Sequence, residues 1–260
     1  ANSMKAFGGI LGGLKNPSLM ARKKNMEDEI RKKTKLKGED YWVELEKAVD
    51  GLKKYSATVT FAGPGGIKGN AVNLMHTLLK YEKTLSMPDN GPAIEKLRTD
   101  IKNLCKDLNS EKEKEYLATY LSELKQYEHA DIKFIDKILD GKTPEARAAK
   151  MLDKTDFADA KDLEEILSKD AKKFGKFDDP LLDAARIIVP KYNEAVTAFQ
   201  SSTPRRRALE SRIANSVFAV KGNNLPPDAT FTLRLADGVV KPYNYNGTTS
   251  PYKTTFYGLY

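Results

Sequence analysis

The spacing of the apolar residues changes once along this chain, close to its C-terminal end, and that change limits the folds the chain can adopt. Up to about Ala219 the apolar residues recur every three or four positions, which is the period of an α-helix buried along one face. Beyond it, Phe231, Leu233 and Leu235 alternate with polar residues, which is typical of a half-buried β-strand. Asp237-Gly238 then predicts a hairpin turn.

The β segment is too short to be stable by itself, because one or two hairpins bury little apolar surface in water. We therefore expect residues 1–221 to form a helical domain and residues 222–260 to begin a β-domain whose remaining strands lie beyond Tyr260. Hydrophobic residues make up 40% of the chain and charged residues 31%, which favours packed helices with a polar surface over disorder. The predicted fold class is mainly α.

Apolar periodicity and capping signals predict the individual helices. They are expected over residues 2–15, 19–35, 39–55, 71–85, 92–108, 111–127, 132–139, 143–152, 160–167, 178–199 and 205–218. Helices 92–108 and 111–127 are joined by a short connection, so they are expected to pack as antiparallel neighbours. Pro190 should kink the longest helix, and the segment Ser201–Pro204 is expected to separate it from the last one.

The glycine-rich segment Gly63–Asn70 superficially resembles a phosphate-binding loop. A true loop of that kind needs a lysine directly followed by a serine or threonine after the last glycine. Here Lys68 precedes Gly69 and no hydroxyl residue follows, so the spacing is wrong. The interpretation is a plain connection between two helices.

The chain offers few residues for catalysis or metal binding. The single cysteine, Cys105, excludes an intrachain disulfide, and its place on an apolar helix face favours a buried thiol. The histidines, His76 and His129, share no spacing motif, and neither a nucleophile elbow nor a zinc motif occurs. We expect no metal, no cofactor and no self-contained active site.

The net charge of +8 raises the question of nucleic-acid binding. Most charges are mixed in sign along helical segments, which indicates a solvated face. The two dense basic runs, Arg22–Lys24 and Arg205–Arg207, carry no interleaved aromatic residues for base stacking. We predict no nucleic-acid partner. No apolar run approaches the length of about 18 residues that a membrane span requires, and no secretory signal is recognised at the N-terminus.

Several segments resemble a known family. They are Pro227–Leu235 (PDATFTLRL), Gly238–Tyr243 (GVVKPY) and Thr254–Gly258 (TTFYG), with looser counterparts in Asn2–Gly9 and Asp178–Leu182. Together they resemble the bacterial serine dipeptidyl peptidases 7 and 11. The likeness is specific in about the last 35 residues and loose through the helices.

The resemblance implies a chymotrypsin-type double β-barrel that is split in sequence by an all-helical domain capping the cleft. It implies an enzyme that releases dipeptides from the free N-terminus of peptides. The family's catalytic histidine and aspartate precede the helical insertion, and its serine follows this chain's last residue. Residues 1–260 would then contain no catalytic residue and would be inactive alone.

The resemblance also implies a substrate-binding residue and an environment for the protein. By motif position, Asn2 is the candidate that binds the α-ammonium group of the substrate, with a helix-capping role as the alternative. The implied partners are oligopeptides and the rest of the catalytic domain, in a homodimeric parent located in the periplasm or at the cell surface. Specificity for the residue before the cut, acidic or apolar, stays open.

A second hypothesis needs no missing domain. The helices could form a free-standing peptide- or protein-binding module without enzymatic activity. A nucleophile segment downstream in the parent reading frame would separate the two hypotheses.

Overall fold

The computed structural model describes residues 11–34, 40–64, 69–128, 133–222, 238–245 and 247–253. The chain divides into two compact units, Ala1–Val220 and Lys221–Tyr260, and each is described by itself. The first unit is built of helices, and the described part of the second contains a two-stranded sheet. The prediction of a mainly α fold is therefore confirmed.

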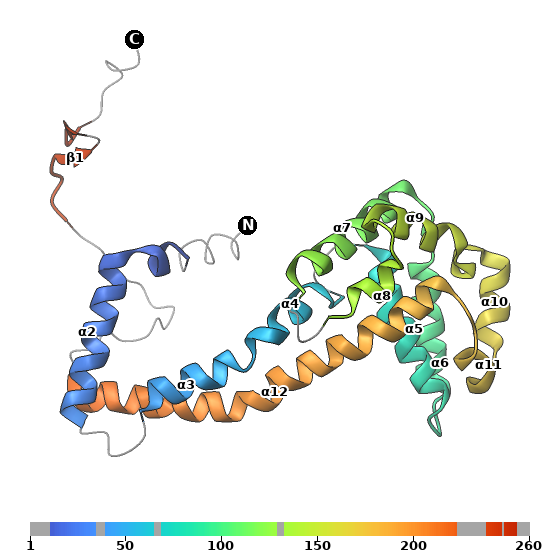
Figure 1. Cartoon of the computed structure of the whole chain (residues 1–260), viewed down its shortest axis with the longest axis horizontal. Helices are drawn as coiled ribbons and strands as arrows, with labels where there is room; N and C mark the ends of the chain where they lie inside the picture. The colour runs from blue at the N-terminus through green and yellow to red at the C-terminus, as the bar shows by residue number, and fades with distance from the viewer. Residues whose placement is uncertain are drawn as a thin grey trace, which may run out of the picture. The chain divides into compact units, whose positions relative to one another are not determined.

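The helices of the first unit follow one another with short connections (Figure 1). They are α2 (Pro17–Thr34), α3 (Tyr41–Asp50), α4 (Lys53–Phe61), α5 (Asn70–Leu85), α6 (Gly91–Leu104), α7 (Glu111–Tyr127), α8 (Ile135–Leu139), α9 (Pro144–Lys154), η2 (Asp156–Ala158, a 3₁₀ turn), α10 (Ala160–Ser168), α11 (Ala171–Gly175) and α12 (Pro180–Lys221). Residues 11–15 are also helical. Among the described residues, no helix has the length and apolar character needed to cross a membrane.

Side-chain caps explain where several helices begin. The side chains of Asp40, Ser110, Thr143, Asp159 and Asp170 each accept a hydrogen bond from a backbone N–H in the first turn of the following helix. Those first N–H groups have no partner inside the helix, so a short polar side chain at the N-cap stabilises the start. The predicted starts after Ser110 and Thr143 follow this rule.

The apolar core lies among α5 to α11 and the first part of α12. Helix α5 packs against α6, α7 and α11, and α7 packs chiefly against α9 (Figure 1). The expected pairing of 92–108 with 111–127 is wrong, because α6 packs along α5 instead. The helical part of that segment ends at Leu104, although Leu108 beyond it is still buried.

Two predicted boundaries differ from the structure. The expected helix 39–55 is interrupted at Gly51, and α4 then continues to Phe61. Glycine has a low helix propensity, and the break buries the side chain of Leu52.

The predicted separation of the last two helices at Ser201–Pro204 is also wrong, because α12 continues through Pro190 and Pro204. The fixed φ of proline is compatible with a helix, although a backbone donor is lost. The hydroxyl groups of Ser202 and Thr203 donate to the Phe199 carbonyl at 2.8 and 3.0 Å. These two hydrogen bonds stabilise the helical turn before Pro204.

The second unit contains a short antiparallel hairpin of β1 (Tyr243–Tyr245) and β2 (Thr248–Ser250), in which Tyr243 pairs with Ser250. Gly247 has a φ of 78°, which glycine adopts easily in a tight turn. Val239 and Val240 lie before the hairpin outside any strand. The predicted strand 230–235 and Asp237 fall outside the described residues.

Candidate functional site

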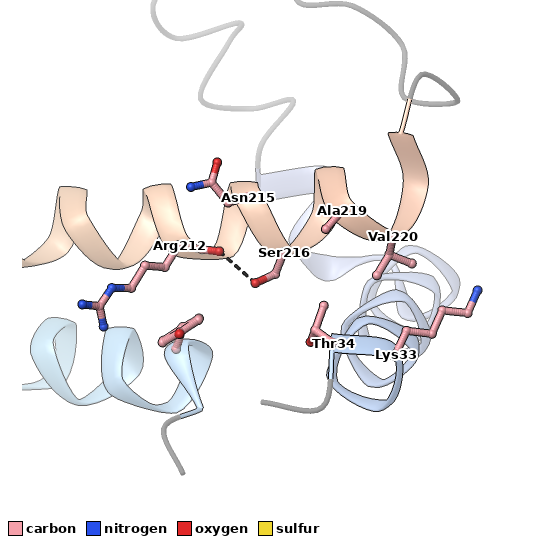
Figure 2. Close-up of a pocket in the computed structure, with 8 residues that line it drawn as sticks. Lys33, Thr34, Arg212, Asn215, Ser216, Ala219 and Val220 are labelled. Atoms are coloured by element: carbon pink, nitrogen blue, oxygen red, sulfur yellow. Dashed lines mark hydrogen bonds between the residues drawn. The ribbon is translucent and has the colours of Figure 1, made fainter. Parts of the chain in front are cut away.

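An open groove of 620 Å³ lies where α2, α3 and the C-terminal part of α12 meet (Figure 2). We call it the arm groove. It is lined by Lys33, Thr34, Tyr41, Arg212, Asn215, Ser216, Ala219 and Val220.

The hydroxyl groups of the arm groove are used within their own helices. Ser216 Oγ donates to the Arg212 carbonyl at 2.9 Å, and Thr34 Oγ1 donates to the Ile30 carbonyl at 2.7 Å. The lining residues that the structure describes include no histidine, and the Ser216 hydroxyl is already bonded within its own helix.

The two cationic side chains of the arm groove are both engaged, one between helices and one within its own helix. The guanidinium of Arg212 lies 5.4 Å from the centre of the Tyr41 ring, and Figure 2 shows it extending from α12 toward α3. Lys33 Nζ lies 2.7 Å from a carboxylate oxygen of Glu29, one turn back on α2. The groove is thus a polar junction between helices, and its charges are already engaged.

His76 lies in α5 and is held by surrounding elements. Its Nε2 donates to the Ala62 carbonyl at 2.9 Å, and its ring meets the Tyr192 ring edge-on at 5.1 Å. Burial lowers the pKa of the imidazole, against the opposing effect of the bond to Ala62. The contacts of the ring with the Ala62 carbonyl and the Tyr192 ring are packing contacts of the kind that the sequence indicated. His129 lies outside the described residues.

Cys105 is half-buried at the C-terminal end of α6. Burial, and secondarily the negative charge of Asp179, raises the pKa of the thiol to about 12. Because the thiolate is the reactive form, this cysteine is not a nucleophile at neutral pH.

The folded chain should therefore protect Cys105 from a disulfide reagent. An unperturbed thiol has a pKa of about 8.5, so at mildly alkaline pH the native protein should react more slowly by a factor on the order of 10³. Following the reaction spectroscopically in buffer and in concentrated guanidinium chloride tests this. Equal rates in the two solvents would contradict the burial of the thiol.

The N-terminus of α5 is occupied by a carboxylate of the chain itself. Glu113 Oε2, from α7, accepts the backbone N–H groups of Asn70 and Ala71 at 2.8 and 3.1 Å. Glu113 is buried, and Gly69 lets the backbone approach Tyr116 closely. An anion entering here would meet an existing negative charge, which agrees with reading the segment 63–70 as a helix connection. Residues 65–68 lie outside the described part.

The expected substrate-binding residue, Asn2, lies outside the described residues, so its role stays a prediction. Within the part of the chain that the structure describes, no cluster of histidine, cysteine, aspartate or glutamate side chains could hold a metal ion. The described helices thus offer grooves between them as candidate binding sites.

This helical architecture is similar to one in a solved structure, the crystal structure of Porphyromonas endodontalis DPP11. The TM-score is 0.56 at 20% sequence identity, over 95% of this chain and 37% of that chain. This chain therefore corresponds to little more than a third of that protein's length.

A sequence profile of the family Peptidase S46 matches residues 1–260. The chain belongs to the Peptidase S46 family. No curated protein matches the chain. The resemblance to the serine dipeptidyl peptidases 7 and 11 is thereby confirmed at the level of the family.

The sequence analysis did not predict the contacts that residues far apart in the chain make in the fold. Glu113 of α7 caps α5, and His76 packs edge-on against Tyr192. Both contacts join residues that are far apart along the chain. The pattern Ser110-x-x-Glu113 signals a capping box. The start of α7 was predicted from Asn109-Ser110 alone, and nothing local indicates that Glu113 would cap another helix.

Proposed function

We propose that this chain is the helical part of a serine exopeptidase that releases dipeptides from the free N-terminus of peptides. The helices cap the cleft, limit the length of substrate that precedes the scissile bond, and help bind the substrate N-terminus. The serine, histidine and aspartate of the triad belong to parts of the protein outside residues 1–260. The working enzyme is a homodimer of the periplasm or cell surface.

The observation that carries this proposal is the Peptidase S46 match over residues 1–260. The architecture is consistent with a partial domain, since its solved counterpart is the much longer DPP11 chain.

Assays of the full-length protein and of residues 1–260 test the proposal. The full-length protein should release dipeptides from peptides with a free N-terminus, should ignore N-acetylated ones and should be inhibited by a serine-directed reagent. Residues 1–260 alone should give no turnover. Peptide binding without hydrolysis by the full-length protein would instead support a helical binding module.

We expect Asn2→Ala in the full-length enzyme to raise KM for dipeptidyl substrates. A hydrogen bond to a charged group contributes about 1–3 kcal/mol, so kcat/KM should fall by about 5- to 150-fold. The physical reason is that a buried amide oxygen distinguishes a terminal ammonium from an internal amide. Initial-rate kinetics on a dipeptidyl fluorogenic substrate measures the change.

Two control variants separate substrate binding from helix capping. Asn16 caps α2 by accepting the N–H of Ser18 at 3.0 Å, so Asn16→Ala should lower Tm without changing KM. Asn2→Ser keeps a capping side chain but removes the amide. A normal KM in Asn2→Ser and Asn2→Ala would exclude Asn2 from the binding site.

A further inference from the structure

A second groove, of 320 Å³, runs between α5 and α12. We call it the lysine groove. It is lined by His76, Leu79, Lys80, Lys83, Val189 and Asn193. Positions 76, 80 and 83 are four and three residues apart, so these side chains share one face of α5. Leu79 and Val189 are buried and provide an apolar floor.

The two lysines of this groove have no carboxylate partner in the part of the chain that the structure describes. Among the described residues, no acidic side chain pairs with Lys80 or Lys83, and both lysines are exposed. Glu82, between them in sequence, binds Arg186 at 3.3 Å. Two unpaired like charges one helical turn apart repel each other, so an anion between them would relieve the repulsion.

The acidic residue nearest in sequence on the α12 side is also engaged. Glu194 follows Asn193 directly, and its carboxylate lies 2.9 Å from Lys191 Nζ. The amide of Asn193 adds a neutral donor to the two ammonium groups without adding negative charge.

The imidazole at one end of the groove is held in a fixed orientation. The Ala62 carbonyl that accepts from His76 Nε2 also accepts from the Tyr120 hydroxyl at 3.1 Å. A side chain at position 63 would lie 2.6 Å from the Tyr192 ring, so Gly63 allows Tyr192 to pack against the histidine. Because Nε2 carries the hydrogen, Nδ1 of the neutral ring is an acceptor, so the ring reports on the groove without donating to a carboxylate.

Two other grooves lack this combination. In the arm groove the cations are engaged by Glu29 and Tyr41. A groove between α7 and α9 is lined by Glu111, Glu115, Glu123 and Glu145 among others, and Lys114 there is bound to Glu111 and Asp153. The lysine groove therefore has the charge and the apolar floor that suit a small anion on a short aliphatic stem.

We propose that the lysine groove binds the side-chain carboxylate of an acidic peptide, with Lys80 and Lys83 as its counter-ions and Asn193 as a hydrogen-bond donor. The methylene groups of an aspartate or glutamate side chain fit against Leu79 and Val189. The inference rests on the proposed function, because it places an acidic segment of a peptide substrate on the helical part of the enzyme.

Titration of residues 1–260 with acetyl-Glu-Glu-Glu-amide tests the proposal, because a blocked peptide presents only side-chain carboxylates. Acetyl-Gln-Gln-Gln-amide is the matched neutral peptide, and inorganic phosphate and succinate serve as free anions. Calorimetry gives the affinity. The ring-proton shifts of His76, assigned with a His129→Gln variant, report on the groove itself.

The glutamate peptide should bind more tightly than the glutamine peptide and should shift the His76 signals. Lys80→Ala/Lys83→Ala should weaken its binding about 30-fold, since the two charge-assisted bonds together contribute on the order of 2 kcal/mol. Lys96→Ala/Lys112→Ala is the matched control, because it removes the same charge from exposed lysines that line none of the three grooves described above. That control should bind normally.

Three outcomes would overturn the proposal. They are equal affinity for the two peptides, an equal loss in both double variants, and binding of phosphate or succinate without binding of the glutamate peptide. These results are distinct from a failure of the proposed function, which is measured as dipeptide release by the full-length protein.

Discussion

Replacing Asp179 with alanine should lower the free energy of unfolding of the helical unit by about 3–5 kcal/mol, because each buried donor left without a partner costs about 1–3 kcal/mol. Asp179 is almost fully buried at the start of α12. One carboxylate oxygen accepts the N–H groups of Leu181 and Leu182, at 2.8 and 3.1 Å. The other accepts the Thr155 hydroxyl and the Asp156 N–H, both at 2.9 Å.

This carboxylate therefore joins two elements as well as capping one. It holds the turn after α9 against the first turn of α12, so alanine removes a cap and a tertiary contact together. Chemical denaturation followed by circular dichroism measures the loss. Asp170→Ala is the matched control, because Asp170 caps only its own helix at an exposed site. Its loss should be about 1 kcal/mol, and a similar value for Asp179→Ala would contradict the bridging role.

The pH dependence offers an independent check on Asp179. Burial raises the pKa of this carboxyl above its ordinary value of 3.8, although four hydrogen bonds oppose the shift. In the interval between the two values the folded state binds more protons than the unfolded state, so this group's contribution to stability falls as pH rises. The stability difference between wild type and Asp179→Ala should therefore decrease from acidic toward neutral pH.

Local signals were sufficient to predict most helices. Ser110 and Thr143 cap the segments that follow them, and Pro92 lies in the first turn of α6. Such features depend on neighbours within one turn, so the sequence alone reveals them. The family resemblance likewise came from residues that are adjacent in the chain.

Features that depend on packing could not be read from the sequence. Pro204 looked like a helix boundary because its donor is missing, but Leu209 is buried beyond it and Arg205 binds Glu44 of α3 at 2.9 Å. Those distant contacts favour continuing the helix, and they are invisible in a local window. The choice of α5 over α7 as the partner of α6 has the same origin.

The candidate sites illustrate the same limit. Asn2 was proposed only through the family resemblance, and no local property distinguishes it from a helix cap. The lysine groove needs Asn193 of α12 beside Lys80 and Lys83 of α5, which are more than a hundred positions away along the chain. In the sequence its lysines are indistinguishable from an ordinary solvated helix face. The structure adds that the neighbouring carboxylates, Glu82 and Glu194, are paired with other cations.

Tyr81→Ala should cost about as much as the Asp179 variant, with a loss of about 3–5 kcal/mol from removing a buried aromatic ring. The Tyr81 side chain is fully buried in α5, and its ring meets Phe174 of α11 edge-on at 5.1 Å. Its hydroxyl donates to the Leu167 carbonyl at 2.6 Å, at the end of α10. The Tyr81 side chain thus holds both α10 and α11 against α5 in the core.

Tyr81→Phe separates the ring from the hydroxyl. Arg98 Nη2 also donates to the Leu167 carbonyl, at 2.8 Å, so that oxygen keeps a partner when the hydroxyl is removed. The hydroxyl also accepts from Arg98 Nε at 3.3 Å, so Tyr81→Phe removes two hydrogen bonds. The expected loss is about 1–3 kcal/mol, the net contribution of those two bonds. Denaturation of both variants under the same conditions makes the comparison. If phenylalanine destabilised the protein as much as alanine does, the polar contact with Leu167, and not aromatic packing against Phe174, would be what holds α10 and α11 to α5.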